Sequence, residues 1–252
     1  MIHEVEENKM TTLTDLKNLI TEAYQLFSSY LMGDQFEVCH GTCCLQTADG
    51  ELLKRLPVTQ LNCRLIYEYL DAAESMDKFA LAQQIKHLLP KILELLIQGE
   101  NLSHSTEIIL NKCYFNLENA WKTKEIQFMQ KFALAFFQYK AIYFDENYSL
   151  DEYITMFHLA GLDIQPLLDE WVLLLTHHSA LINLANMLNY WFYNGIYNNS
   201  FADHKLKQIM YVWIKNSEHQ NIILDQFLYA LEQNSLTPQQ IETINSASYH
   251  LY

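Results

Sequence analysis

Three cysteines and a histidine lie within six residues of one another near the N-terminal end of the sequence. Cys39, His40, Cys43 and Cys44 fall in a polar stretch, and Cys63 lies in the next apolar segment. Zinc takes four such ligands in a tetrahedron, usually as two closely spaced pairs. Cys39 and Cys43 would form one pair, and Cys63 with Cys44 or His40 would complete the set. The metal-site hypothesis therefore names Cys39, Cys43 and Cys63.

A structural role for these thiols is the simpler interpretation. The second half of the proposed site offers one cysteine and no second pair, and the adjacent Cys43 and Cys44 do not easily bind one ion. Buried cysteines often behave as small hydrophobic side chains. A reactive thiol would need a cation or a helix N-terminus beside it, and the nearest bases, Lys54 and Arg55, are about ten residues away. We therefore favour a turn whose thiols pack beneath helices.

Signatures of the main catalytic classes are missing from the sequence. There is no G-x-S-x-G, H-E-x-x-H or C-x-x-C motif, and the six glycines form no phosphate-binding loop. A di-iron helical bundle needs two Glu-x-x-His motifs, whereas only Glu37 and His40 fit that spacing. The sequence predicts a protein that is not an enzyme and has no cofactor, with zinc as the alternative.

The other chemically informative feature is charge. The 252 residues carry a formal net charge of −14. Residues 141–252 hold 12 acids and only three bases, Lys205, Lys207 and Lys215. Such a field repels nucleic acid and anionic membranes, because both are bound through Lys and Arg. It attracts a basic protein partner, although acidity that only maintains solubility is the competing interpretation.

Acidic pairs and one aromatic run are the candidate contacts for that partner. The acidic pairs are typical of solvated helix ends, where carboxylates complement the helix dipole. The aromatic run is typical of core filling, but tyrosine and tryptophan are also frequent interface anchors. The candidate partner-binding residues are Asp145, Glu146, Asp151, Glu152, Asp163, Asp169, Glu170, Tyr190, Trp191 and Tyr193.

The elements that must position these residues are helices. Only ten residues are Gly or Pro, half are hydrophobic, and the apolar positions recur at helical spacing. The sequence therefore predicts an all-α fold of about a dozen helices, arranged as an irregular multi-helix bundle or a HEAT-like α-solenoid. The expected helices are 12–31, 51–56, 59–74, 77–88, 90–98, 104–115, 122–143, 150–160, 164–176, 178–194, 202–216, 219–234 and 238–247.

Length and segment composition suggest one domain. We expect a flexible N-terminus over 1–11 and a single helical domain over 12–252, with a candidate sub-division near 145–149, where the charge balance changes. No run of about 18 apolar residues predicts a membrane-spanning helix. The polar first ten residues do not resemble a secretory signal, and an odd number of cysteines favours a cytoplasmic location.

Four segments together resemble a family of all-helical bacterial proteins that has no assigned activity. They are 36–44 (FEVCHGTCC), 87–96 (HLLPKILELL), 109–113 (ILNKC, with Trp121 beyond) and 159–168 (LAGLDIQPLL). In that family a Cys-rich turn precedes a short helix and a Leu-Pro element. The order and spacing are similar over residues 24–195. The resemblance implies an all-helical, bacterial, cytoplasmic protein, and it implies no reaction.

These observations lead to two hypotheses. The first is an acidic helical protein–protein interaction module, in its most specific form a bacterial immunity protein that neutralises a basic toxin. The second is a zinc-binding helical protein or enzyme that uses the Cys39–Cys44 and Cys63 cluster. The sequence does not name the partner or the oligomeric state.

Overall fold

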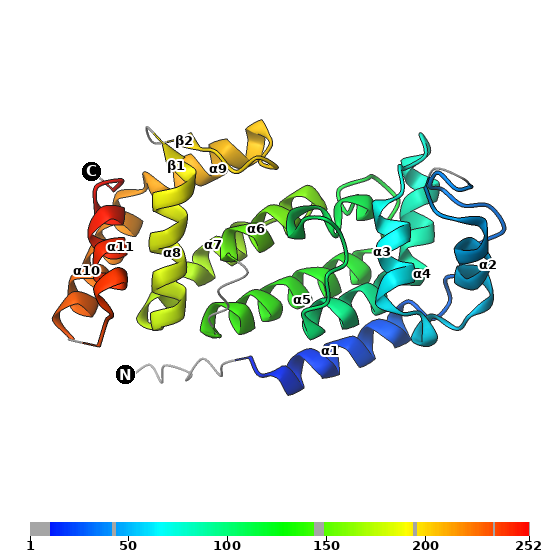
Figure 1. Ribbon diagram of the computed structural model, residues 1–252, viewed down its shortest axis with the longest axis horizontal. Helices are drawn as coiled ribbons and strands as arrows, with labels where there is room; N and C mark the ends of the chain where they lie inside the picture. Colours follow the sequence, from blue (N-terminus) through cyan, green and yellow to red (C-terminus); the bar gives the residue numbers. More distant parts are fainter. Residues whose placement is uncertain (1–10, 42–43, 144–148, 194–195, 234, 252) are drawn as a thin grey trace.

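A computed structural model describes residues 11–41, 44–143, 149–193, 196–233 and 235–251 (Figure 1). Within these ranges the chain forms eleven α-helices, four short 3-10 helices and one two-stranded hairpin. The prediction of an all-α, multi-helix fold is confirmed. No helix in the described ranges has the length and apolar character needed to cross a bilayer.

The helices pack as neighbours from one end of the molecule to the other. In Figure 1, α2, α3 and α4 lie at one end, α1 runs beside α5, and α8, α10 and α11 lie at the opposite end. The helices are α1 (Leu13–Leu26), α2 (Thr47–Arg55), α3 (Cys63–Asp71), α4 (Lys78–Gln98), α5 (Thr123–Ile142), α6 (Leu150–Leu159), α7 (Gln165–Leu173), α8 (His178–Trp191), α9 (His204–Ile214), α10 (Ser217–Glu232) and α11 (Pro238–Ser248). The 3-10 helices are η1 (Val58–Gln60), η2 (Thr106–Ile108), η3 (Asn111–Cys113) and η4 (Leu174–Thr176), and the strands are β1 (Phe192–Tyr193) and β2 (Ile196–Tyr197).

Side-chain caps define where several helices begin. Thr12 forms a reciprocal capping box with Asp15 at the start of α1. Thr237 does the same with Gln240 at the start of α11, where Pro238 occupies the first turn. These contacts satisfy backbone N–H groups that have no partner inside the helix, so the residues mark helix starts in the sequence.

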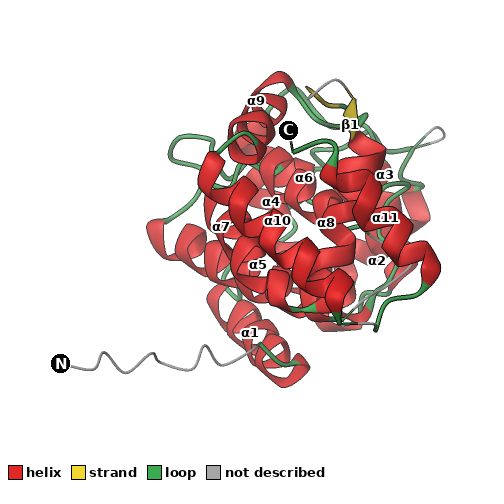
Figure 2. Ribbon diagram, turned by 90° about the vertical axis from the view of Figure 1, so that its left-hand side faces the viewer, coloured by secondary structure: helices red, strands yellow, loops and turns green. Residues whose placement is uncertain are grey.

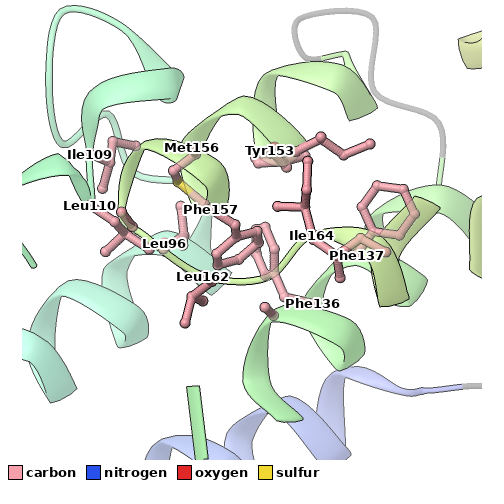
Figure 3. Packing of buried hydrophobic residues seen from close by; sticks show 14 of the residues in the cluster. Leu96, Ile109, Leu110, Phe136, Phe137, Tyr153, Met156, Phe157, Leu162 and Ile164 are labelled. Carbon is pink, nitrogen blue, oxygen red and sulfur yellow. The ribbon is translucent and has the colours of Figure 1, made fainter. Parts of the chain in front are cut away.

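The buried apolar side chains form one continuous cluster from Leu16 to Leu251. Figure 3 shows its middle, where Phe136 and Phe137 of α5 lie close to Tyr153 of α6. The Phe136 and Tyr153 rings meet edge to face with centroids 5.0 Å apart. On its other side, Phe137 packs edge-on against Trp171 of α7, at 5.8 Å. Each such side chain contributes roughly 1.5–3 kcal/mol by leaving water. Helix α5 contacts α1, α6, α7 and α8, so it is central to the core.

One ion pair is buried inside this core. Lys86 of α4 and Glu125 of α5 are each 2% exposed, and the Lys86 Nζ lies 3.0 Å from a Glu125 carboxylate oxygen. The Tyr30 hydroxyl donates to the same carboxylate. The Lys86 Nζ also lies 4.7 Å from the Tyr30 ring centroid and 4.8 Å from that of Trp121. Burial alone would raise the pKa of Glu125, but the hydrogen bonds outweigh it and the pKa lies below its ordinary value.

The predicted break at Pro90 is wrong. Helix α4 runs without interruption from Lys78 to Gln98 with Pro90 inside it. A proline in a helix interior costs about 3 kcal/mol, because it removes a hydrogen bond and crowds the preceding turn. Leu88, Leu89, Ile92 and Leu93 around it are fully buried. Their burial offsets that cost.

The predicted helix 104–115 is also wrong. The segment forms η2 and η3, because contacts with α3 hold it in another shape. The Ser103 hydroxyl and His104 ring contact the Asp71 carboxylate, and the Lys112 Nζ donates to the Leu70 carbonyl at 2.6 Å. Tertiary contacts therefore override the helical spacing of the apolar residues.

Several predicted boundaries shift. Helix α1 ends at Leu26, α2 begins at Thr47, and α3 begins at Cys63 with Asn62 as its cap, while Thr59 belongs to η1. The predicted helix 178–194 ends at Trp191, because the next residues turn into the β1–β2 hairpin. The candidate sub-division near 145–149 falls largely on residues 144–148, which lie outside the described ranges.

Candidate partner-binding surface

The acidic residues predicted to contact a partner divide into three groups. Asp145 and Glu146 lie outside the described residues. Asp163, two residues before α7, and Asp169, within α7, are both exposed. Gln165 hydrogen-bonds to both carboxylates. Glu170 is half-buried and accepts from the Gln138 amide at 2.9 Å. Asp163 and Asp169 are therefore available at the surface.

Asp151 and Glu152 behave differently from the predicted solvated pair. Asp151 has 0% exposed surface, and Glu152 is half-buried. In the first turn of α6 the neighbouring side chains of Leu150 and Tyr153 are buried as well. The expectation of a solvated helix end is therefore wrong for Asp151, which lies out of reach of a docking partner.

Both carboxyls belong to a buried group that we call the carboxyl cluster: Glu107, Asp151, Glu152, Tyr197 and Asn199. The Tyr197 hydroxyl donates to Asp151 Oδ2 at 2.7 Å. The Asn199 Nδ2 donates to Glu107 Oε1 at 3.2 Å and lies 3.5 Å from Asp151 Oδ2. The cluster therefore ties together η2, the start of α6 and the loop that follows β2.

Serine hydroxyls complete the hydrogen bonding of the cluster. Ser149 donates to Asp151 and Ser105 donates to Glu107, each from two residues earlier in the chain. Thr155 lies 3.3 Å from the Tyr197 hydroxyl. Among the described residues, neither Lys nor Arg forms an ion pair with these three carboxyls.

Burial and mutual repulsion shift the titration of the cluster. Burial raises the pKa of Asp151, against the hydrogen bonds from Ser149, Tyr197 and Asn199. Burial, followed by the nearby charges of Glu107 and Asp151, raises the pKa of Glu152 to about 7. Burial and the Asp151 charge raise the pKa of Tyr197. Asp151 and Glu152 therefore retain their protons to a higher pH than ordinary carboxyls do.

The predicted aromatic contacts are also separated by the structure. Tyr190 is exposed near the end of α8, and Trp191 is half-buried. Phe192, the next residue, is buried and pairs with Tyr197 across the hairpin. The side chain of Tyr193 lies outside the described part. The run therefore supplies both core and surface, and among its described side chains only Tyr190 offers a large exposed ring.

Helices α10 and α11 lie at the end of the molecule that faces the viewer in Figure 2. They carry several exposed apolar side chains. A groove of about 440 Å³ lies between these helices. The α10 side chains recur at helical spacing along one stripe, the pattern of a helix face that packs on a partner. The residues that line the groove are Leu224, Phe227, Leu228 and Leu231 from α10, and Asn245, Ser248 and Tyr249 from α11 and its end.

The stripe is only partly covered within the chain. Phe227 is buried, whereas Leu228 is 60% exposed and Tyr249 is 81% exposed. Tyr229 beside them is also exposed. A contiguous exposed apolar patch beside a groove is typical of an interaction site. We call these residues, with those that line the groove, the α10–α11 surface.

Charge on the same two helices has one sign. Residues 217–252 contain the acids Glu218, Asp225, Glu232 and Glu242 and neither Lys nor Arg. All four carboxylates are exposed, and none of them pairs with a described basic side chain. An apolar groove between helices that bear exposed acids and neither Lys nor Arg complements an amphipathic segment that is basic at its edges.

The sequence predicted this surface only in part. Tyr249 stands in the C-terminal run YHLY, for which the sequence allows either docking back on the fold or projection toward a partner. Leu251 in the same run is buried, and its carbonyl accepts from Gln220 at 2.6 Å. The sequence predicts a helix over 219–234, but spacing alone does not show which of its apolar faces lacks a neighbour.

The cysteines do not form a site in the described part of the chain. Cys39 and Cys44 are half-buried and Cys43 lies outside the described residues. Cys63 donates to the Asn101 carbonyl at 3.3 Å, and burial and Glu100 raise the pKa of its thiol. The described residues contain no group of three or more His, Cys, Asp or Glu suited to a metal ion. Zinc binding by Cys39, Cys43 and Cys63 therefore stays a prediction.

Beside the Cys-rich turn lies a second cavity, of about 430 Å³. Its lining includes Asp34, His40, Glu51 and Lys54. The Lys54 Nζ donates to the Asp34 carbonyl and lies 4.6 Å from the Phe36 ring centroid. Acids and a base share this cavity, so its charge favours no one class of ligand.

Comparison of the chain with protein-family models, with curated proteins and with solved structures finds no match. The family resemblance of the four sequence segments therefore stays a prediction.

Proposed function

We propose that this protein is a protein–protein interaction module that binds a basic amphipathic helix of its partner on the α10–α11 surface. The observation that carries the proposal is the coincidence of exposed Leu228 and Tyr249 with a groove whose helices bear four acids and no Lys or Arg. Apolar contacts would supply affinity, and the acids would steer the partner and set its orientation.

The same charges argue against a second copy of the chain as the occupant. A symmetric dimer through this surface would bring Glu218, Asp225, Glu232 and Glu242 of both copies together without a base. Like charges across an interface cost free energy. A basic partner removes that cost, and it fits the net charge of −14 carried by the whole chain. An immunity protein that neutralises a basic toxin is the specific form of this function.

A designed peptide tests the proposal. We expect a 14-residue helix of Leu and Lys, with its leucines on one face, to bind the protein, because it matches both the groove and its charge. A peptide of the same composition in scrambled order keeps the charge and loses the apolar face. We expect it to bind at least about tenfold more weakly, a difference of about 1.4 kcal/mol. A Leu and Glu helix should not bind. Fluorescence anisotropy measures all three affinities.

Matched variants locate the binding. Leu228→Ala with Tyr249→Ala should weaken binding of the Leu and Lys helix at least about tenfold, because both side chains are exposed anchors. Leu31→Ala with Met76→Ala is the control, since both residues are exposed and apolar but lie outside α10 and α11. Equal affinity for the ordered and scrambled peptides, or equal loss in both double variants, would contradict the proposal. Thermal melts check that the truncations leave the fold intact.

A further inference from the structure

The carboxyl cluster is the contact at which three separate segments of the chain meet. Glu107 comes from η2, Asp151 and Glu152 from the first turn of α6, and Asn199 from the loop between β2 and α9. Asn199 is 1% exposed, and its amide spans from Glu107 to Asp151. The side-chain oxygen Oδ1 of Asn199 accepts a hydrogen bond from the Phe201 backbone N–H at 2.9 Å. The Asn199 side chain therefore links the loop that leads into α9 to two of these carboxyls.

Charged side chains on the neighbouring elements make contacts of their own with other groups. From α5, the Lys140 Nζ lies over the rings of Phe136 and Tyr153. From η3, Lys112 donates to the Leu70 carbonyl. At the far end of α6, His158 lies 3.0 Å from Asp203, the cap of α9. Tyr197 is the one other titratable group in the cluster, and it acts as a donor to Asp151. A bound proton is therefore what relieves repulsion among the three carboxyls.

We propose that the carboxyl cluster is a proton-sensitive clasp, which holds residues 103–113 and 196–203 on α6 while it retains a proton and loosens them once its three carboxyls are all ionised. The hydrogen bonds from Asn199 and Tyr197 span the junction, so they are the contacts that repulsion among the carboxylates would strain. The device is independent of any partner at the α10–α11 surface.

The sign of the effect follows from the direction of the shifts. The pKa of Glu152 rises from 4.5 in the unfolded chain to about 7 in the folded one. Between these values the folded protein binds more protons, so stability falls as pH rises. The raised pKa of Asp151 acts in the same direction. The clasp is therefore closed in mildly acidic solution and weakens as the pH passes through neutrality.

Hydrogen exchange measured by mass spectrometry tests the clasp in the full chain. After correction for the intrinsic pH dependence of exchange, the protection of residues 103–113 and 196–203 should fall about three- to tenfold between pH 6 and pH 8. Glu152→Gln cannot ionise, so its protection should change less than about twofold. Glu107→Gln should behave in the same way, which keeps the test available if one variant folds poorly.

Glu170→Gln is the matched control. It removes a half-buried carboxyl that is hydrogen-bonded to an amide but lies outside the carboxyl cluster. It should lose protection with pH as the wild type does. Unchanged protection in the wild type, or an equal fall in Glu152→Gln and the wild type, would overturn the proposal.

Discussion

Replacing Lys86 by methionine should destabilise the protein by about 3–5 kcal/mol at neutral pH, because it leaves the Glu125 carboxylate buried without its cation. The two groups are 3.0 Å apart and almost fully buried. Methionine keeps the length of the side chain, so the loss reports on charge more than on volume. Urea denaturation followed by circular dichroism measures the free energy of unfolding.

The pH dependence of the same variant gives an internal check. The pKa of Glu125 is lowered in the folded protein, so its ion pair adds stability above the unfolded value of 4.5 and loses it as the pH falls. The difference between Lys86→Met and the wild type should therefore shrink in acid. Adding Glu125→Gln to Lys86→Met should restore part of the lost stability, because no isolated charge remains. A loss below about 1 kcal/mol in Lys86→Met would contradict this account.

Gly161→Ala should be the next most damaging substitution, at about 2–4 kcal/mol. Gly161 ends α6 with φ +91°, and an added Cβ would lie 2.8 Å from the Asn116 backbone nitrogen. Backbone cannot move aside as a flexible side chain can. The segment that holds Asn116 also contacts the end of α6 directly, because the Phe115 amide donates to the Ala160 carbonyl at 2.7 Å.

A second glycine separates strain from collision. Gly99 ends α4 with φ +78°, and an added Cβ there would meet nothing within 4 Å. Gly99→Ala should lower the free energy of unfolding by about 1 kcal/mol, because alanine is strained in the left-handed backbone conformation. Urea midpoints of the two variants compare them directly. Equal losses at both positions would show that the Asn116 contact is unimportant.

The parts of the fold that the sequence predicts are those set by local chemistry. Thr12 and Thr237 cap helices through a side chain that lies three residues from its backbone partner, which is a local contact. Pro90 is the instructive failure. Its local effect is unfavourable, but leucines and isoleucines on both sides of it are buried against other helices. That burial depends on residues far away in the sequence.

The candidate site shows the same division. The acidic residues of 217–252 can be counted from the sequence, and their charge indicates that the proposed partner is basic. The burial of Asp151 cannot be predicted from the sequence, because it depends on contacts of Asn199 and Tyr197 with α6. The exposure of Leu228 cannot be predicted from the sequence either, since an apolar helix stripe is normally covered by a neighbouring element. Which apolar face lacks a neighbour is decided by tertiary packing.

The most direct test of the central claim is to map where the Leu and Lys helix binds. A copy of the peptide with a photoreactive benzophenone on its apolar face is irradiated with the protein, and the attachment sites are read by mass spectrometry. We expect attachment to residues of α10 and α11, around Leu228 and Tyr249. Attachment spread evenly over the chain, or concentrated at the α2–α4 end, would contradict it.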